Sequence, residues 1–255
     1  MRIWINSFVV AKRILIALVR TKRTLVFWAV FPSLMLLLFG LIYAGGSGTA
    51  ASFDQTTPGI LVGAALFFSC LGGPVATLVT ERESGTLRRL LLSPLTGTSY
   101  FLGVVFAHLA IAAGQTTIVY AIAAAFGARF HGSLLLGGVI LFLTVISYCG
   151  MGFFFGANFA RRTEDVNGPV AAFGVPLLAL GGTFFSPSIM PPYLRTVAQF
   201  DPIFHMNESL KAVAANGAPV RSIMSHLAVL VSFAFASLLL GALSYRRLLK
   251  VEQSG

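Results

Sequence analysis

Charged side chains are scarce in this sequence of 255 residues. They make up 10% of the chain, against about 25% in ordinary soluble domains. Hydrophobic residues make up 56%, and the mean hydropathy is +0.86. No polar stretch is long enough to form a water-soluble domain with its own core. The composition therefore excludes a mostly soluble protein and favours a chain whose solvent is lipid.

Cysteine and intramembrane carboxylates are also lacking. The two cysteines, Cys70 and Cys149, both lie in apolar runs, which indicates packing rather than a disulfide or a metal site. None of the eight acidic residues lies at the centre of an apolar run. Because ion-coupled transporters usually keep charges at membrane depth, a gradient-driven transporter becomes less favoured, as does a membrane-embedded hydrolase. We also expect no cleaved signal peptide, since no small-residue cleavage site precedes the first long apolar run.

Six apolar segments have about the 20 residues that a membrane span requires. They are residues 25–43, 60–79, 101–126, 134–159, 167–185 and 223–245. The net charge of +10 does not indicate nucleic-acid binding, because the basic residues cluster at the ends of these segments. With the N-terminus inside, fourteen of the 18 Lys and Arg residues lie in the cytoplasm, and only Arg129, Arg195, Lys211 and Arg221 lie outside. We therefore expect both termini in the cytoplasm.

An amphipathic helix is predicted ahead of the first span, at residues 2–22. Arg2, Arg13 and Arg20 fall on one stripe, while Trp4 and Phe8 fall on the opposite side. This pattern is typical of a helix in the inner membrane interface, with its arginines toward headgroups or water.

A short charged helix is predicted between the second and third spans, in residues 81–95. Thr80 and Glu83 have the spacing of a capping box, so the helix is expected to begin at Glu81 with both glutamates in its first turn. Leu87 and its neighbouring leucines form an apolar strip, and Pro94 ends the helix. The exposed charges make this run a candidate surface for a partner protein.

Prolines divide residues 186–222 into two short amphipathic pieces, near 192–200 and 205–215, too short to cross a bilayer. Inside the spans, His108 and Gln115 share a helix face, for which hydrogen bonding between helices is the favoured explanation. Gly152 fits close helix packing, and the Gly72-Gly73-Pro74 run indicates a bend in the second span.

The order of these parts resembles the permeases of the type-2 ATP-binding-cassette (ABC) exporter family. That family includes drug and antibiotic efflux permeases and polysaccharide exporters. The run E-R-E-x-G-T-L-x-x-L-x-x-S-P-L at 81–95 resembles the family's coupling helix. Residues 184–211 resemble its external segment, with Asp201 where the family usually has asparagine and His205 after Phe204.

The resemblance implies an all-α, polytopic membrane protein that is one transmembrane domain. Its parts would be an interfacial helix (1–24), spans 1–2 (25–80), a coupling helix (81–98), spans 3–5 (99–185), an external re-entrant segment (186–222), and the last span with a cytoplasmic tail (223–255). It also implies a homo- or heterodimer whose first and fifth spans face the dimer seam. Contacts to a separate cytoplasmic ATPase are expected at Glu81, Arg82, Glu83, Gly85, Thr86, Leu87, Arg88 and Arg89.

We expect no catalytic residue, metal or cofactor in this chain. The G-x-x-x-x-G-K-[ST] loop that cradles nucleotide phosphates is missing, so ATP and Mg²⁺ would be used by the ATPase partner. The spans have aromatic and aliphatic walls, which favours hydrophobic drugs or lipid-like substrates. Candidate path residues are Phe27, Trp28, Phe31, Phe67, Phe68, His108 and Gln115. The expected location is a plasma membrane, of bacterial type.

Three alternatives stay open. A polysaccharide or glycolipid exporter would belong to the same family. A gradient-driven carrier or channel would work without an ATPase. A membrane enzyme or assembly factor would use one of the four histidines, the only acid–base groups near neutral pH: His108, His131, His205 and His226.

Overall fold

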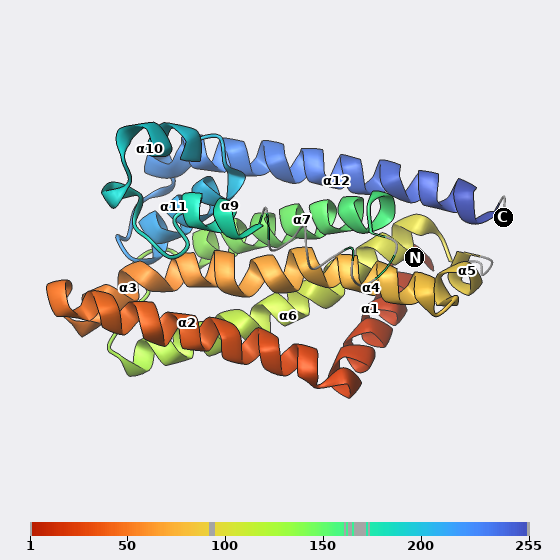
Figure 1. Cartoon of the computed structure of the whole chain (residues 1–255), viewed down its shortest axis with the longest axis horizontal. Helices are drawn as coiled ribbons and strands as arrows, with labels where there is room; N and C mark the ends of the chain where they lie inside the picture. The colour runs from red at the N-terminus through yellow and green to blue at the C-terminus, as the bar shows by residue number, and fades with distance from the viewer. Residues whose placement is uncertain are drawn as a thin grey trace.

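The computed structural model of the chain describes residues 2–91, 95–160, 162, 165, 172 and 174–253. These residues form helices and contain no strand, which confirms the all-α prediction. The long helices pack lengthwise into an elongated bundle (Figure 1). Helix α5 (Thr86–Leu91) lies at one end of the bundle, and α10 (Pro192–Ala198) and α11 (Pro202–Ala214) lie at the other. These ends are called the α5 end and the α11 end below.

Five helices in the described part of the chain are long and apolar enough to cross a membrane. They are Arg23–Ser47 (α2), Thr49–Glu83, Gly97–Ala125 (α6), Leu134–Asn158 (α7) and Val220–Ser244. The last one joins a short 3₁₀ turn, Val220–Ile223 (η4), to the start of α12 (Met224–Gln253). Of the predicted span at 167–185, the structure describes residue 172 and residues 174–185, and the helix α9 within them (Val175–Leu180) is only six residues long. Six spans therefore stay a prediction.

The second membrane-crossing helix is the axis of the bundle. It consists of α3 (Thr49–Gly59), a π-helical stretch η1 (Ile60–Gly72) and α4 (Gly73–Glu83). In the most apolar 18-residue stretch of this helix 83% of the residues are buried, whereas in the corresponding stretch of α2 only 22% are buried. The predicted bend at Gly72-Gly73-Pro74 coincides with the change from π- to α-helix, where Pro74 has no N–H to donate to the preceding turn of this long helix. With 35 residues, this helix is longer than a bilayer core requires.

Glycines allow α7 to approach its neighbours closely. Helix α7 packs along α12 and against η1. A methyl group added at Gly152 would lie 2.3 Å from the carbonyl oxygen of Leu71, and one at Gly150 would lie 2.6 Å from the backbone of Ser237. The predicted close packing at Gly152 is therefore confirmed, because only hydrogen fits at this contact.

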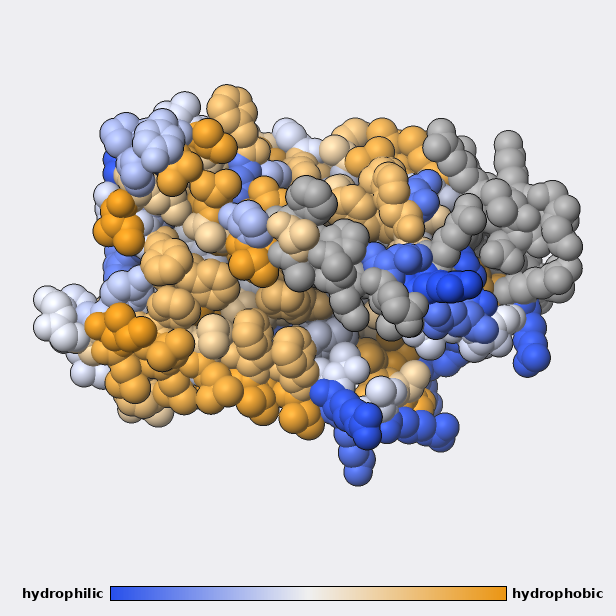
Figure 2. Space-filling view, viewed as in Figure 1, coloured by the Kyte–Doolittle hydropathy of each residue, from blue (hydrophilic) through white to orange (hydrophobic). Residues whose placement is uncertain are grey.

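The N-terminal helix α1 (Arg2–Thr21) packs along α6 and turns into α2 at Lys22. Its inward face includes Val10 and Ile14, and its exposed Trp4 and Phe8 rings stack on Phe106 of α6. Arg20 is exposed, as expected, whereas Arg13 turns inward toward α4. The description of Arg2 is limited to its helical backbone. Figure 2 shows hydrophilic residues gathered at the α1–α2 junction and a hydrophobic surface along α2.

Short helices follow α9 at the α11 end. They are a 3₁₀ turn, Pro187–Ile189 (η3), and helices α10 and α11. Helix α11 begins at Pro202, earlier than the expected residue 205, because the Asp201 carboxylate accepts the backbone N–H of Ile203 at 2.9 Å. A side-chain cap followed by proline at the first position is a strong helix start. Whether these helices dip into a membrane leaflet stays a prediction.

Candidate functional site

The charged run between the second and third spans forms an elbow, defined here as residues 81–91. Helix α4 continues without a break through Thr80 to Glu83, and the chain turns at Ser84 and Gly85 into α5. Gly85 has φ +67°, a left-handed conformation that glycine adopts without strain. The predicted helix start at Glu81 is wrong, since Thr80 lies inside α4 and both glutamates occupy its last turn.

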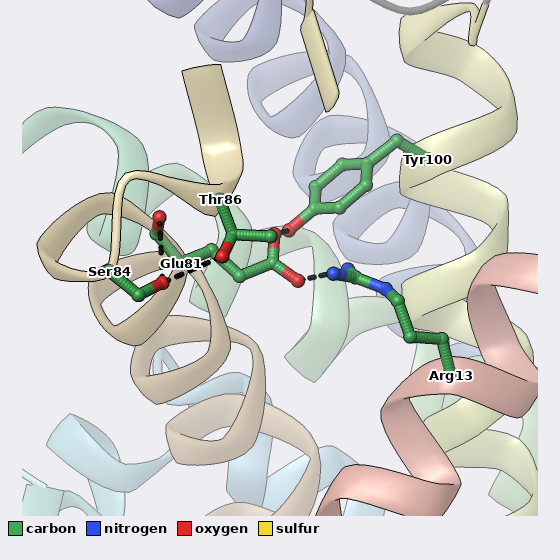
Figure 3. Close-up of polar contacts among 5 residues, drawn as sticks. All are labelled: Arg13, Glu81, Ser84, Thr86 and Tyr100. Carbon is green, nitrogen blue, oxygen red and sulfur yellow. Dashed lines mark hydrogen bonds and ion pairs between the residues drawn. The ribbon is translucent and has the colours of Figure 1, made fainter. Parts of the chain in front are cut away.

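Glu81 lies at the centre of the elbow contacts, and its side chain is only 10% exposed. One carboxylate oxygen forms an ion pair with the guanidinium of Arg13 on α1. The other accepts the hydroxyl of Tyr100 on α6 at 2.5 Å (Figure 3). A buried carboxylate is stable when a cation and a hydrogen-bond donor satisfy it. Glu81 therefore joins α4 to both α1 and α6, and it is not the exposed contact that the sequence predicted.

Arg82 joins the elbow to a third helix. Its guanidinium donates to the backbone carbonyl of Ala160 at 2.5 Å and, at longer distances, to those of Gly156 and Ala157. The carbonyls of Gly156 and Ala157 lie in the last turn of α7 and that of Ala160 lies just beyond it, where a cation also interacts favourably with the helix dipole. Arg82 thus binds α7 within this chain, and its predicted contact with an ATPase stays a prediction.

The remaining elbow residues divide into an inner and an outer group. Leu87 is buried, and Leu90 packs against the same core, as the apolar strip predicted. The hydroxyl groups of Thr86 and Ser84 are hydrogen-bonded at 2.9 Å. Glu83, Gly85 and Arg89 are exposed. Arg88 is described by its helical backbone alone. Of the eight predicted contact residues, Glu83, Gly85 and Arg89 are thus exposed and Glu81 and Leu87 are buried, and contact with an ATPase stays a prediction.

A cleft of about 350 Å³ opens beside the Arg13–Glu81 contact, between α1, α2 and α4. Its apolar walls include Ile14, Leu18 and Trp28. Hydroxyl groups from Thr24, Thr77 and Thr80 also line it. Such a combination suits a molecule with a large apolar part and a few polar groups.

Four of the predicted path residues form a row of aromatic rings between α2 and η1. The ring centroids of Phe27 and Phe31 are 5.3 Å apart, those of Phe31 and Phe68 are 5.4 Å apart, and those of Phe68 and Phe67 are 5.4 Å apart. Phe27 is half exposed on the outer face of α2, whereas Phe67 is buried. The row therefore leads from the surface of the bundle toward its interior.

The other three predicted path residues lie in a polar cluster inside the bundle. The amide of Gln115 donates to the backbone carbonyl of Trp28 at 2.8 Å and accepts the hydroxyl of Ser69 at 2.6 Å. The Nδ1 atom of His108 is 2.8 Å from the carbonyl oxygen of Val104. His108 and Gln115 are buried, so they contact neighbouring helices and do not face a described pocket.

The four histidines do not form one site. His108 lies inside the bundle, and His131 lies 3.0 Å from the Asp54 carboxylate at the α11 end. His205 and His226 face each other, with their Nδ1 atoms 2.9 Å apart. The structure therefore brings His205 and His226 together and keeps His108 and His131 apart from them, and the membrane-enzyme alternative stays untested.

The sequence did not predict the roles of Tyr100, which binds Glu81, and of Ser69, which binds Gln115. Both are hydroxyl residues within apolar helices, and nothing in the sequence indicates which partner they meet. A tyrosine at the start of the helix that follows a charged run was the available signal for Tyr100.

Residues 6–214 match the family model described as ABC-2 type transporter. The chain belongs to this family. Among its relatives are the proteins named probable multidrug ABC transporter permease YbhR in Escherichia coli K12 and in Escherichia coli O157:H7. Each is 32% identical over 138 residues, which are 54% of this chain and 37% of the relative. The match thus covers little more than a third of the relatives' length. The resemblance drawn from the sequence is confirmed, and members of this family are membrane subunits that work with ABC ATPase subunits.

Proposed function

We propose that this ABC-2 family chain is the membrane subunit of an ATP-driven exporter for hydrophobic or amphiphilic small molecules. In this proposal ATP and Mg²⁺ are used by a separate cytoplasmic ATPase, and the chain pairs with a second permease subunit in a bacterial plasma membrane. Both termini lie in the cytoplasm, which places the α5 end inside. The basic residues at the α1–α2 junction support this orientation.

The observation that carries the proposal is the connectivity of the elbow. Its outward residues include Glu83 and Arg89, while two adjacent inward residues contact three other helices. A force on the outward surface therefore reaches α1 and α6 through Glu81 and α7 through Arg82. Such a junction suits the transmission of ATPase closure to a bundle with two packed arrangements.

Substrate class is inferred from the surfaces near the elbow. The cleft between α1, α2 and α4 is mainly apolar, and the aromatic row begins on the exposed face of α2. That face includes a stripe of exposed apolar residues: Val26, Val30, Leu34, Leu38 and Leu41. It would contact lipid, substrate or the second subunit, since a large apolar surface is unstable in water. The name of the YbhR relatives supports a drug-like substrate.

The test is to express the full chain with its ATPase and to change the outward charges of the elbow. Arg89→Glu, alone and with Glu83→Arg, is expected to lower ATPase co-purification and ATP-driven substrate uptake into inside-out vesicles. Arg221→Glu changes an exposed charge at the α11 end and is the matched control. Wild-type co-purification and export by the elbow variants would contradict the docking assignment. Uphill transport by the permease alone in liposomes would contradict the ATP-driven mechanism.

A further inference from the structure

A second pocket lies at the α11 end, far from the elbow. It has a volume of about 220 Å³ and is bordered by the ends of α2 and α3, by residues 182–186 and by α11. Its polar lining includes Tyr43, Thr56, Asn207, Glu208 and Lys211. The elbow does not contribute to it, and the proposed function assigns it no role.

Three hydroxyl groups in this pocket, those of Tyr43, Ser47 and Thr56, have already donated their hydrogens. Tyr43 donates to the carbonyl of Phe184 at 3.0 Å, and Ser47 donates to the carbonyl of Tyr43 at 3.2 Å. Thr56 donates to the carbonyl of Ser52 at 2.8 Å. A hydroxyl that donates to the protein keeps its lone pairs for another partner. These side chains therefore offer acceptors, and not donors, to a molecule in the pocket.

Asn207 adds an unsatisfied acceptor. It is 2% exposed, and its Nδ2 atom donates to the carbonyl of Gly181 at 2.6 Å and to the hydroxyl oxygen of Thr183 at 3.3 Å. Since a carbonyl can only accept, the amide nitrogen must face Gly181, which fixes the orientation of the side chain. Its Oδ1 atom has no hydrogen-bond partner among the described residues. A buried acceptor without a partner is costly, but this oxygen has almost no accessible surface, so it marks a polar wall beside the pocket and not a contact open to a ligand.

Two charges of opposite sign complete the pocket. Glu208 and Lys211 are half-buried, and no ion pair or hydrogen bond of either side chain occurs in the described part of the chain. They are three positions apart on α11, so their Cβ atoms are about 5–6 Å apart. A ligand with both an ammonium and an anionic group can therefore meet both residues. The aromatic rings of Tyr43 and Phe184 flank the same space and favour a cation nearby.

We propose that this pocket binds a small zwitterion in which a primary ammonium group is close to a phosphate or carboxylate. The ammonium donates to Glu208 and to the hydroxyl lone pairs, and the anionic group binds Lys211. The ligand is either a free molecule or the head group of a lipid. The placement of the pocket on the outer surface rests on the orientation in the proposed function, whereas the binding chemistry does not.

The first experiment measures binding of O-phosphoethanolamine to the purified full chain in detergent by isothermal titration calorimetry. Phosphocholine is the decisive comparator, because its quaternary nitrogen has no N–H to donate. We expect phosphocholine to bind at least about tenfold more weakly, as the loss of charge-assisted hydrogen bonds implies. Ethanolamine alone and inorganic phosphate alone should each be weaker by a similar factor. Equal binding of phosphocholine and phosphoethanolamine would overturn the proposal.

Variants then assign the two halves of the ligand. Glu208→Gln should weaken ethanolamine binding about tenfold and leave phosphate binding unchanged, and Lys211→Gln should do the reverse. Both side chains are half-buried and make no hydrogen bond in the described part of the chain, so neither change should alter folding, which the thermal unfolding temperature checks. Arg221→Gln removes an exposed charge at the same end and should have no effect on binding. If Glu208→Gln and Lys211→Gln bind like Arg221→Gln, the pocket is not the site.

A further arm distinguishes the two sources of the ligand. The chain is placed in nanodiscs of phosphatidylcholine with or without phosphatidylethanolamine, and binding of soluble O-phosphoethanolamine is measured. Competition by phosphatidylethanolamine identifies a lipid head group, and unchanged binding identifies a soluble ligand. These measurements need no ATP, so their failure leaves the exporter proposal intact, and loss of ATP-driven export leaves the binding result intact.

Discussion

Removal of the Arg13 charge should destabilise the protein more than removal of the Glu81 charge, although the two residues form one ion pair. The reason is the difference in burial. The Glu81 side chain is 10% exposed, and that of Arg13 is 37% exposed. Arg13→Met leaves a buried carboxylate with the Tyr100 hydroxyl as its remaining partner among the described residues. Glu81→Gln leaves a guanidinium that water can reach.

The size of the stability loss follows from the burial of this ion pair, which lies between that of a fully exposed pair and that of a fully buried one. Exposed ion pairs contribute about 0.2–1 kcal/mol, and breaking a buried pair costs about 3–5 kcal/mol. For Arg13→Met we expect a loss of about 2–3 kcal/mol, because the stranded charge is buried but the pair is partly screened by solvent. For Glu81→Gln we expect about 1 kcal/mol, because glutamine keeps a hydrogen bond to Tyr100. The double variant should lose less than the sum, by about 1–2 kcal/mol.

Thermal unfolding of the detergent-purified chain measures the effect, at about 2–4 °C of Tm for each kcal/mol. Lys12→Met is the matched control. Lys12 is the exposed neighbour of Arg13 on α1, and this substitution also removes one positive charge. An equal Tm for Arg13→Met and Lys12→Met would refute the reasoning. The reasoning would also be refuted if the stability loss of the double variant equalled the sum of the losses of Arg13→Met and Glu81→Gln within about 0.5 kcal/mol.

Three further outcomes are expected. Arg82→Gln should destabilise the protein by about 1–2 kcal/mol through loss of the cap on α7, and Arg82→Lys should recover part of this in thermal unfolding. Gly152→Ala should cost about 1–3 kcal/mol because its methyl group meets a carbonyl of η1, whereas Gly138→Ala, in open space on the same helix, should be neutral or slightly stabilising. Burial raises the pKa of Asp201 from 3.8 to about 6, so the folded state binds this proton more tightly than the unfolded state does. The free energy of unfolding should therefore decrease as the pH rises from about 4 to about 6. Asp201→Asn keeps a helix cap and should remove that part of the decline, which Tm measured against pH will show.

Hydrophobic runs and prolines carried most of the fold information in this sequence. The long helices lie where apolar runs of about 20 residues predict them, since that length is dictated by the bilayer. Helices α10 and α11 lie near the two pieces that proline spacing predicts. These are local signals, and they depend little on what each segment contacts.

The elbow could not be predicted in detail, because its structure depends on contacts between distant residues. Thr80 and Glu83 have the local spacing of a helix start, yet α4 continues through both. Glu81 meets Arg13 across 68 positions of sequence, and this contact is invisible to any local pattern. The acceptor-rich pocket was missed for the same reason, since Asn207 and Tyr43 come from helices at opposite ends of the chain.

The elbow and the outer pocket are connected by one continuous helix. Glu81 lies at one end of the helix formed by α3, η1 and α4, and Gln55 and Thr56 line the pocket near its other end, on the order of 40 Å away. This helix cannot slide freely past α7, because Gly152 lies against the backbone of Leu71 and Arg82 holds the end of α7. Under the proposed function, displacement of the elbow would therefore move this helix together with α7. The wall of the pocket formed by α3 would then shift relative to α11, so ATPase action at one end would change the affinity of the site at the other.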